Sequence, residues 1–126
     1  MPSSTIDLAS TRCLILDEDS PVVRDASGVR DLIEEALSER ARVIAVPVSR
    51  LGDAFFDLRT GLAGELLQKC ANYRVTLAVI GDVSKFVDAS AAFRDLVVEA
   101  NRSPSVWFLA DLPALETKVA ATAQAS

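Results

Sequence analysis

The chain has 126 residues, half of them hydrophobic and a quarter charged, and carries a formal net charge of −5. This size and composition fit one domain with its own core and exclude disordered and fibrous proteins. The negative charge is unlike the basic surfaces that bind nucleic acid, and the lack of any histidine excludes Ser-His-Asp triads, Cys-His pairs and the usual zinc sites.

The first part of the chain predicts one strand and one helix. Residues 1–10 lack the basic and apolar regions of a signal peptide, and we expect them to be flexible. The apolar run 13–16 has the length of a strand. A helix is expected after Ser27 as its N-cap, because hydrophobic residues then recur at helical spacing: Val29, Leu32, Ile33, Ala36 and Leu37.

The middle of the chain repeats this order. The apolar run 43–46 predicts a second strand, and a helix is expected over residues 61–72 with Thr60 as its cap. On the surface of that helix Glu65 and Lys69 are spaced to form an ion pair. The residues expected to face the core are Leu62, Leu66 and Cys70.

The last part predicts two further strands and two further helices. The strands are expected at residues 75–80 and 106–109. Between them Asp88 or Ser90 would cap a helix whose hydrophobic face consists of Phe93, Leu96, Val97 and Ala100. A last helix is expected after Asp111, and it would bury Leu115 and Val119.

Strands and helices alternate along the chain, which is the pattern of parallel strands joined by helical crossovers. We therefore predict a single compact α/β domain over residues 1–126, with a mainly parallel sheet of four to five strands and four to five helices. Residues 120–126 are expected to be flexible.

The two cysteines indicate the cellular compartment. Cys13 and Cys70 lie in apolar segments without a CxxC or secreted-type pattern, so we expect buried free thiols and a reducing environment. No apolar run approaches the length of a membrane span. The sequence thus predicts a cytoplasmic protein with no membrane partner.

Several segments resemble one bacterial family. They are residues 55–69, 72–75, 78–82, 99–102 and the strand 106–108. Together they resemble the family called domain of unknown function 4180, over roughly residues 29–119. The residues ahead of Ala26 match that family poorly, so they carry no family inference.

That family is in turn similar to the fold of sulphate-transporter cytoplasmic domains and anti-sigma-factor antagonists, the STAS-like fold. The likeness implies a small switch module that binds a partner protein. In the antagonists an Asp-Ser-Ser-Gly stretch opens a helix, and its second serine is phosphorylated. Residues 57–61 are similar, with Thr60 at the matching position, although residues 48–56 separate them from the preceding strand.

The same motif is the first candidate binding site. Backbone N–H groups at the start of a helix and the Arg59 guanidinium could hold an anion or a phosphate. The alternative is that Thr60 caps the helix and Arg59 pairs with Asp57. The candidate binding residues are Asp57, Arg59, Thr60, Gly61, Gly64, Glu65 and Asp82.

Acidic residues after the strands form a second candidate. Their carboxylates could hold Mg²⁺, because ligand sites in parallel sheets gather at the carboxyl ends of the strands. Lys85 would be the nearby cation, and turn formation or helix capping is the alternative explanation. The residues concerned are Asp17, Asp19, Asp82 and Asp111.

Two functional hypotheses follow. The first is a non-enzymatic regulatory or protein-binding module that uses residues 57–65, with a protein partner or a second copy of the chain bound to it. The second is a small-molecule or Mg²⁺-dependent enzyme that works at the acidic edge of the sheet. No catalytic residue, metal site or cofactor can be named from the sequence.

Overall fold

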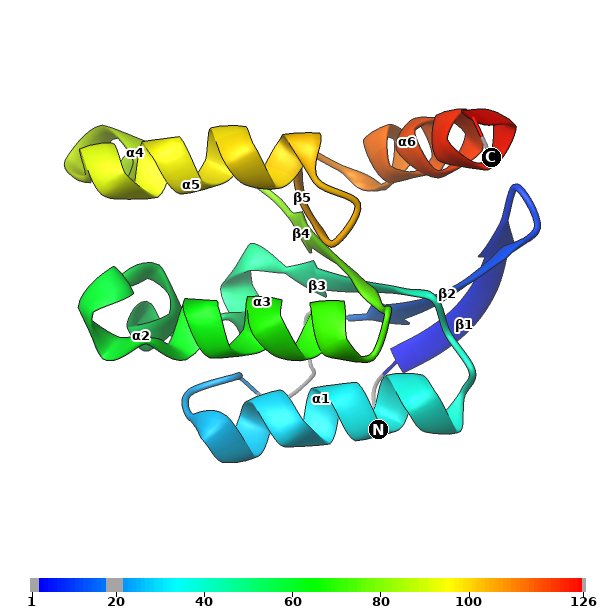
Figure 1. Ribbon diagram of the computed structural model, residues 1–126, viewed down its shortest axis with the longest axis horizontal. Coiled ribbons are helices and arrows are strands. Elements are labelled where there is room, and N and C mark those ends of the chain that lie inside the picture. Colours follow the sequence, from blue (N-terminus) through cyan, green and yellow to red (C-terminus); the bar gives the residue numbers. More distant parts are fainter. Residues whose placement is uncertain (1–2, 18–21, 126) are drawn as a thin grey trace.

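The computed structural model describes residues 3–17 and 22–125 and shows one small α/β domain (Figure 1). Its sheet has five strands, which lie side by side in the order in which they occur along the chain. The strands are β1 (Ser3–Leu8), β2 (Thr11–Leu16), β3 (Val43–Pro47), β4 (Thr76–Ile80) and β5 (Val106–Leu109).

The prediction of a mainly parallel sheet was wrong, because the sheet is mixed. β2, β3, β4 and β5 are parallel as expected, but β1 pairs with β2 antiparallel. The connection is a two-residue turn at Ala9 and Ser10, whose φ angles of 49° and 66° match the twist of a tight hairpin. Residues 1–10, in which no element was expected, thus contain the whole of β1 and both residues of the turn.

Six α-helices lie within the described residues, more than the four to five predicted. The three crossovers between parallel strands all carry helices onto one face of the sheet, as right-handed crossovers must when strands are added in one direction. The helices are α1 (Ala26–Ser38), α2 (Asp53–Phe56), α3 (Leu62–Asn72), α4 (Ser84–Ala89), α5 (Ala91–Arg102) and α6 (Leu112–Ala125).

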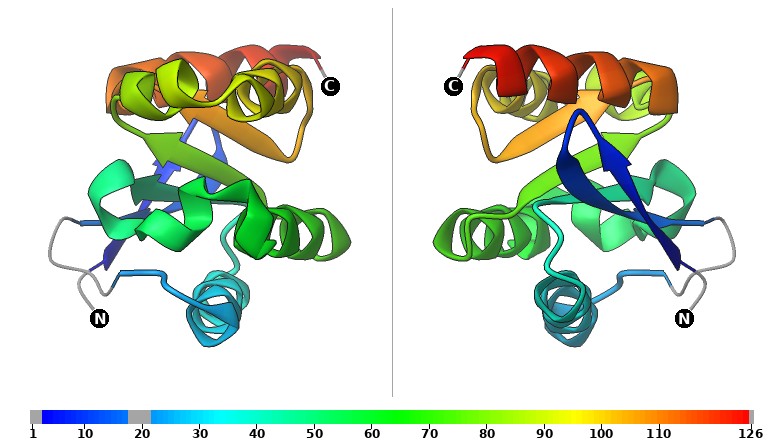
Figure 2. Two further views of the ribbon diagram at one scale, coloured as in Figure 1. Left: turned by 90° about the vertical axis from the view of Figure 1, so that its left-hand side faces the viewer. Right: turned by 90° about the vertical axis from the view of Figure 1, so that its right-hand side faces the viewer.

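The two faces of the sheet are covered unequally. Leu14, Ile44 and Leu77 belong to the larger core, which is built with side chains of α1, α2, α3 and α5. The alternate residues Cys13, Ala45 and Ala78 face the other way and belong to a smaller core, to which only α6 among the described helices contributes. Figure 2 shows α6 on the same side as the β1–β2 hairpin.

The buried face of helix α1 is the predicted one, except at the two ends of the helix. Val29, Leu32, Ile33 and Ala36 are buried, but Leu37 is 45% exposed. The cap is Asp25 instead of Ser27, and its side chain accepts a hydrogen bond from the Gly28 N–H at 3.0 Å. The Asp25 carboxylate satisfies one of the free N–H groups of the first turn, which is the role that the sequence had assigned to Ser27.

The later helices bury most of the expected residues. Leu62, Leu66 and Cys70 of α3 are buried, and so are Phe93 and Ala100 of α5 and Leu115 and Val119 of α6. Leu96 and Val97, the other two residues expected on the hydrophobic face of α5, are only half-buried and pack against the larger core. Of the two candidate caps of α5, Ser90 is the correct one, since its hydroxyl accepts from the Phe93 N–H at 3.1 Å. Helix α6 continues to Ala125, through the segment in which no element was expected.

Among the described residues, no helix combines the length and apolar character that crossing a membrane requires.

Candidate functional site

An aromatic cluster fixes the segment that leads to the predicted site. Phe55 and Phe56 of α2 are buried, and the ring of Phe56 stacks on Phe86 of α4 with 3.8 Å between the centroids. Phe93 of α5 meets both of these stacked rings edge to face. The short helix α2 is therefore anchored in the core, although residues 48–58 have no amphipathic pattern that predicts a helix.

A tight turn (Leu58–Thr60) follows α2 and holds a bidentate ion pair. The Arg59 guanidinium donates to the two carboxylate oxygens of Asp57 at 3.0 and 2.9 Å, and the Arg59 backbone N–H donates to Asp57 Oδ1 at 3.1 Å. These bonds, the side-chain bond first, lower the pKa of Asp57. The Arg59 side chain is nevertheless 90% exposed.

Thr60 lies at the start of α3 and is an exposed residue, and its hydroxyl forms local hydrogen bonds. It donates to the carbonyl oxygen of Ala54 at 2.6 Å and accepts from the N–H of Leu62 at 3.2 Å. It therefore satisfies a free N–H group of the helix, as predicted. The cap position itself is occupied by Gly61, whose φ of 76° lies in the left-handed region that favours glycine.

The surface around these residues is open. Apart from the adjoining residues and the backbone of α3 itself, no atom lies within 4 Å of the position that a Cβ atom would take on Gly61 or Gly64, and both glycines are exposed. Glu65 is half-buried, and the predicted ion pair between Glu65 and Lys69, both of which the structure describes, is not formed. The ion pair of this surface is that of Arg59 with Asp57. We call residues 57–65 the α3-start surface.

Asp82 is the one predicted binding residue outside this segment. Its carboxylate accepts from the Ser84 N–H at 2.8 Å and from the Ser84 hydroxyl, and these bonds lower the pKa of Asp82. It lines a hollow of about 370 Å³ with residues of α4, α5 and β5. The stacking of Phe56 on Phe86 connects the two regions, but Asp82 performs a local role at the start of α4.

The acidic candidates that the structure describes do not gather into a group that could hold a metal ion. Asp17 and Asp111 line one hollow of about 590 Å³, whereas Asp82 lines the other hollow. Asp111 accepts from the Ala114 N–H at 2.9 Å and thereby caps α6. No group of three metal-binding side chains occurs within residues 3–17 and 22–125, and Asp19 lies outside the described residues.

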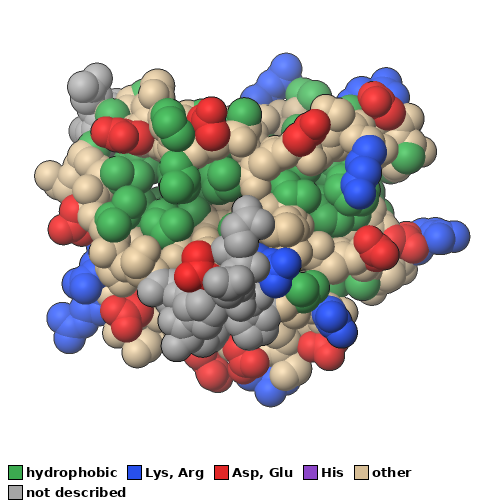
Figure 3. All heavy atoms as spheres, turned by 180° about the vertical axis from the view of Figure 1, so that it is seen from behind, with side chains coloured by type: hydrophobic (Ala, Val, Ile, Leu, Met, Phe, Trp, Pro, Cys, Tyr) green, Lys and Arg blue, Asp and Glu red, His purple; other side chains and the backbone are tan. Residues whose placement is uncertain are grey.

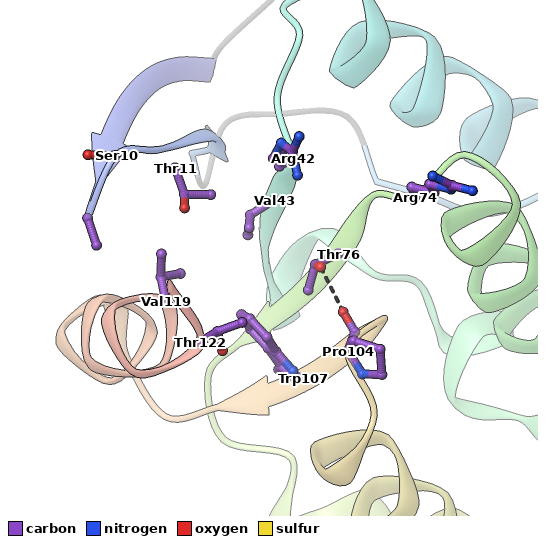
Figure 4. A pocket seen from close by; sticks show the side chains of 11 residues that line it. Ser10, Thr11, Arg42, Val43, Arg74, Thr76, Pro104, Trp107, Val119 and Thr122 are labelled. Atoms are coloured by element: carbon purple, nitrogen blue, oxygen red, sulfur yellow. Dashed lines mark hydrogen bonds between the residues drawn. The ribbon is translucent and has the colours of Figure 1, made fainter. Parts of the chain in front are cut away.

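A further pocket of about 570 Å³ lies at the opposite end of the parallel strands (Figure 4). Its floor contains Trp107, whose indole N–H donates to the Ser103 carbonyl at 2.9 Å. Arg42 and Arg74 belong to its rim, but Figure 4 shows Arg74 directed away from the other labelled side chains. No pattern in the sequence marks this pocket, because its lining residues come from five separate segments.

Both cysteines are free and buried, as predicted. Burial raises the pKa of the Cys70 thiol to about 12 and also raises the pKa of Cys13. Because the thiolate is the reactive form, neither group is suited to act as a nucleophile near neutral pH.

A protein-family model matches residues 8–119, which include every strand from β2 onward. The chain belongs to the family described as Domain of unknown function (DUF4180). The match begins well before residue 29, so β2 is part of the DUF4180 domain, and the interpretation that the residues ahead of Ala26 match the family poorly was wrong. Searches of curated proteins and of solved structures found no match.

Proposed function

We propose that this DUF4180 protein is a cytoplasmic, non-enzymatic regulatory module that binds a partner protein through the α3-start surface. The observation that carries the proposal is the exposed residue Thr60 beside Arg59, whose side chain is 90% exposed, at the start of α3. A buried aromatic cluster holds this surface in place, and binding surfaces on a rigid support lose little entropy when a partner binds.

The geometry supports a switch in which Arg59 exchanges partners. A phosphate on Thr60 would carry up to two negative charges close to the Asp57 carboxylate, and like charges at that distance repel. Arg59 is fully ionised and can form bidentate bonds with phosphate as well as with carboxylate. Phosphorylation would therefore draw the guanidinium from Asp57 to the phosphate and change the charge presented to a partner.

The likeness to anti-sigma-factor antagonists belongs to the same proposal. It rests on the motif at residues 57–61 and on the position of Thr60 at the first turn of a helix, where added negative charge is tolerated. The lowered pKa values of two carboxyl groups argue against a role for either as a general acid. Asp57 and Asp82 both have lowered pKa values, whereas a carboxylic acid that donates a proton at neutral pH needs a raised one.

The experiment compares three substitutions at one position. The protein and the variants Thr60→Ser, Thr60→Ala and Thr60→Glu are immobilised, and the proteins that each retains from an extract of the native host are quantified. Thr60→Ser keeps the hydroxyl and should retain the same amount of partner as the unmodified protein. Thr60→Glu should change the amount of retained partner at least tenfold, in either direction. Equal capture by Thr60→Ser and Thr60→Glu, with circular dichroism unchanged, would contradict the proposal.

A further inference from the structure

The two outer strands of the sheet differ in how their free edges are protected. The carbonyls of Ser105 and Leu109 accept hydrogen bonds from β4, so Val106 and Phe108 of β5 direct their N–H groups to the outside. Both N–H groups are taken up by side chains at the end of α5. Phe108 donates to Asn101 Oδ1 at 2.7 Å, and Val106 donates to Ser103 Oγ at 3.4 Å.

The edge of β1 has no comparable protection among the described residues. Leu8 pairs with Thr11 across the two-residue turn, which makes them a hydrogen-bonded pair, and the bonding alternates from there along the hairpin. Residues 4, 6 and 8 therefore bond to β2, while Thr5 and Asp7 direct their N–H and C=O groups away from the sheet. The carbonyl of Arg12, which lies opposite Asp7, accepts from Arg42 next to β3, as this alternation requires.

We infer that the outer edge of β1 is a self-association surface, which pairs antiparallel with β1 of a second copy of the chain. An exposed strand edge offers a row of unpaired donors and acceptors to another strand. The outward N–H groups of β5 are already bonded, whereas, within the described part of the chain, those of β1 are not, so only the β1 edge can pair with another strand. Pairing at one edge stops at a two-fold dimer instead of continuing into a fibre. The right-hand view of Figure 2 shows the hairpin at the outside of the sheet.

The residues of β1 favour one register. With Ile6 on the two-fold axis, the two copies of β1 pair over residues 4–8. Each Thr5, whose backbone N–H and C=O point away from β2, then lies opposite Asp7 of the second copy. The threonine hydroxyl can then donate to the carboxylate, and the two Ile6 side chains, each 41% exposed, cover each other. A shift that brought Asp7 opposite Asp7 would place like charges together, which is destabilising.

The second copy is the occupant that this edge fits best. The strand meets its own sequence with a polar pair on one face and an apolar pair on the other, and the two-fold axis makes each contact twice. This surface lies at the edge of the sheet, whereas the proposed partner site lies at the start of α3. The two proposals therefore fail or succeed separately.

Light scattering coupled to gel filtration tests the inference. The protein should have twice its chain mass of 13.5 kDa. Thr5→Pro removes a backbone N–H that points away from β2 and would bond to the second copy. This variant should therefore have the mass of a single chain. Thr5→Ala is the matched control: it loses the same hydroxyl, which contacts Glu39 at 3.5 Å, but it keeps the N–H and should remain a dimer.

Ile6→Lys is a second variant, because it places two ammonium groups face to face on the axis at a position that is exposed in one copy. It should also give a particle of single-chain mass, with a thermal transition that shows a folded protein. A wild-type protein that is monomeric at every concentration would overturn the inference, and so would a folded Thr5→Pro or Ile6→Lys variant that stays dimeric. Thr60→Glu should stay dimeric even where it changes partner capture.

Discussion

The side chain of Asn101, one residue before the end of α5, accepts a hydrogen bond from the backbone N–H of Phe108 in the outermost parallel strand. Its own carbonyl oxygen accepts from Lys118 Nζ at 3.0 Å, so one residue connects α5, β5 and α6. Lys118 also lies over the Trp107 ring, with 5.4 Å from Nζ to the centroid. The end of α5 therefore completes the sheet edge in addition to ending a helix.

Asn101→Ala should lower the free energy of unfolding by about 1–3 kcal/mol, because it leaves the Phe108 N–H without its acceptor. Urea denaturation measures the loss. Asn101→Asp is the control, since the carboxylate keeps an acceptor at the same position and should recover most of the stability. Equal losses in the two variants would show that the hydrogen bond to Phe108 does not matter.

Leu66→Ala should lower the free energy of unfolding by about 2–5 kcal/mol, because the Leu66 side chain is fully buried between α3 and the sheet. Gln68→Ala on the exposed side of the same helix should change it by less than about 0.5 kcal/mol. Denaturation curves of both variants check the orientation of α3. A loss near zero for Leu66→Ala would mean that α3 packs on the sheet through another side.

Much of the fold could be predicted because its signals are local. The parallel strands read as continuous apolar runs, since each is covered on both faces at its centre, and α1, α3 and α5 have hydrophobic residues at helical spacing. Strand β1 was missed because it is an edge strand with only two large hydrophobic residues, Ile6 and Leu8. Its antiparallel direction follows from the turn at Ala9 and Ser10, which lacks the Asn, Asp and Gly residues typical of two-residue hairpin turns.

At the candidate site, only the contacts between residues close together in the sequence could be predicted. The pairing of Arg59 with Asp57 and the contact of Thr60 with the first turn of α3 depend on neighbours two or three residues apart, and both were anticipated as alternatives. The stacking of Phe56 on Phe86 depends on how α2 and α4 pack, for which the sequence carries no periodic signal. For the same reason, the spread of the acidic residues over separate hollows became visible only in the folded chain.

Magnesium should leave the melting temperature unchanged. A cation stabilises the native state only if that state offers a site that the unfolded chain lacks, and Asp82 and Asp111 already accept hydrogen bonds from the starts of α4 and α6. A thermal melt at increasing MgCl₂, with NaCl of equal ionic strength as the control, measures this. A rise with MgCl₂ alone, abolished by Asp82→Asn, would instead favour the enzyme hypothesis.

Asp57 should titrate below the ordinary range of an aspartate, because the Arg59 side chain and backbone both donate to its carboxylate and lower its pKa. Carboxyl carbon NMR in the acid range follows the midpoint. In Arg59→Ala the side-chain bonds are lost but the backbone N–H remains, so the pKa should rise without reaching that of a free aspartate. The Lys69→Ala variant of α3, at a half-buried position away from Asp57, has the same change in charge and should leave the midpoint in place.

The sign of the effect on stability follows from that direction. A carboxyl group whose pKa is lower in the folded than in the unfolded state stabilises the fold above its unfolded value, near pH 4, and this contribution disappears as the pH falls through the folded value. The protein and Arg59→Ala should therefore differ in stability at neutral pH and converge in acid. Because the pair is exposed, added salt should shrink the difference. A difference that grew toward low pH would show that Arg59 acts on the fold through something other than Asp57.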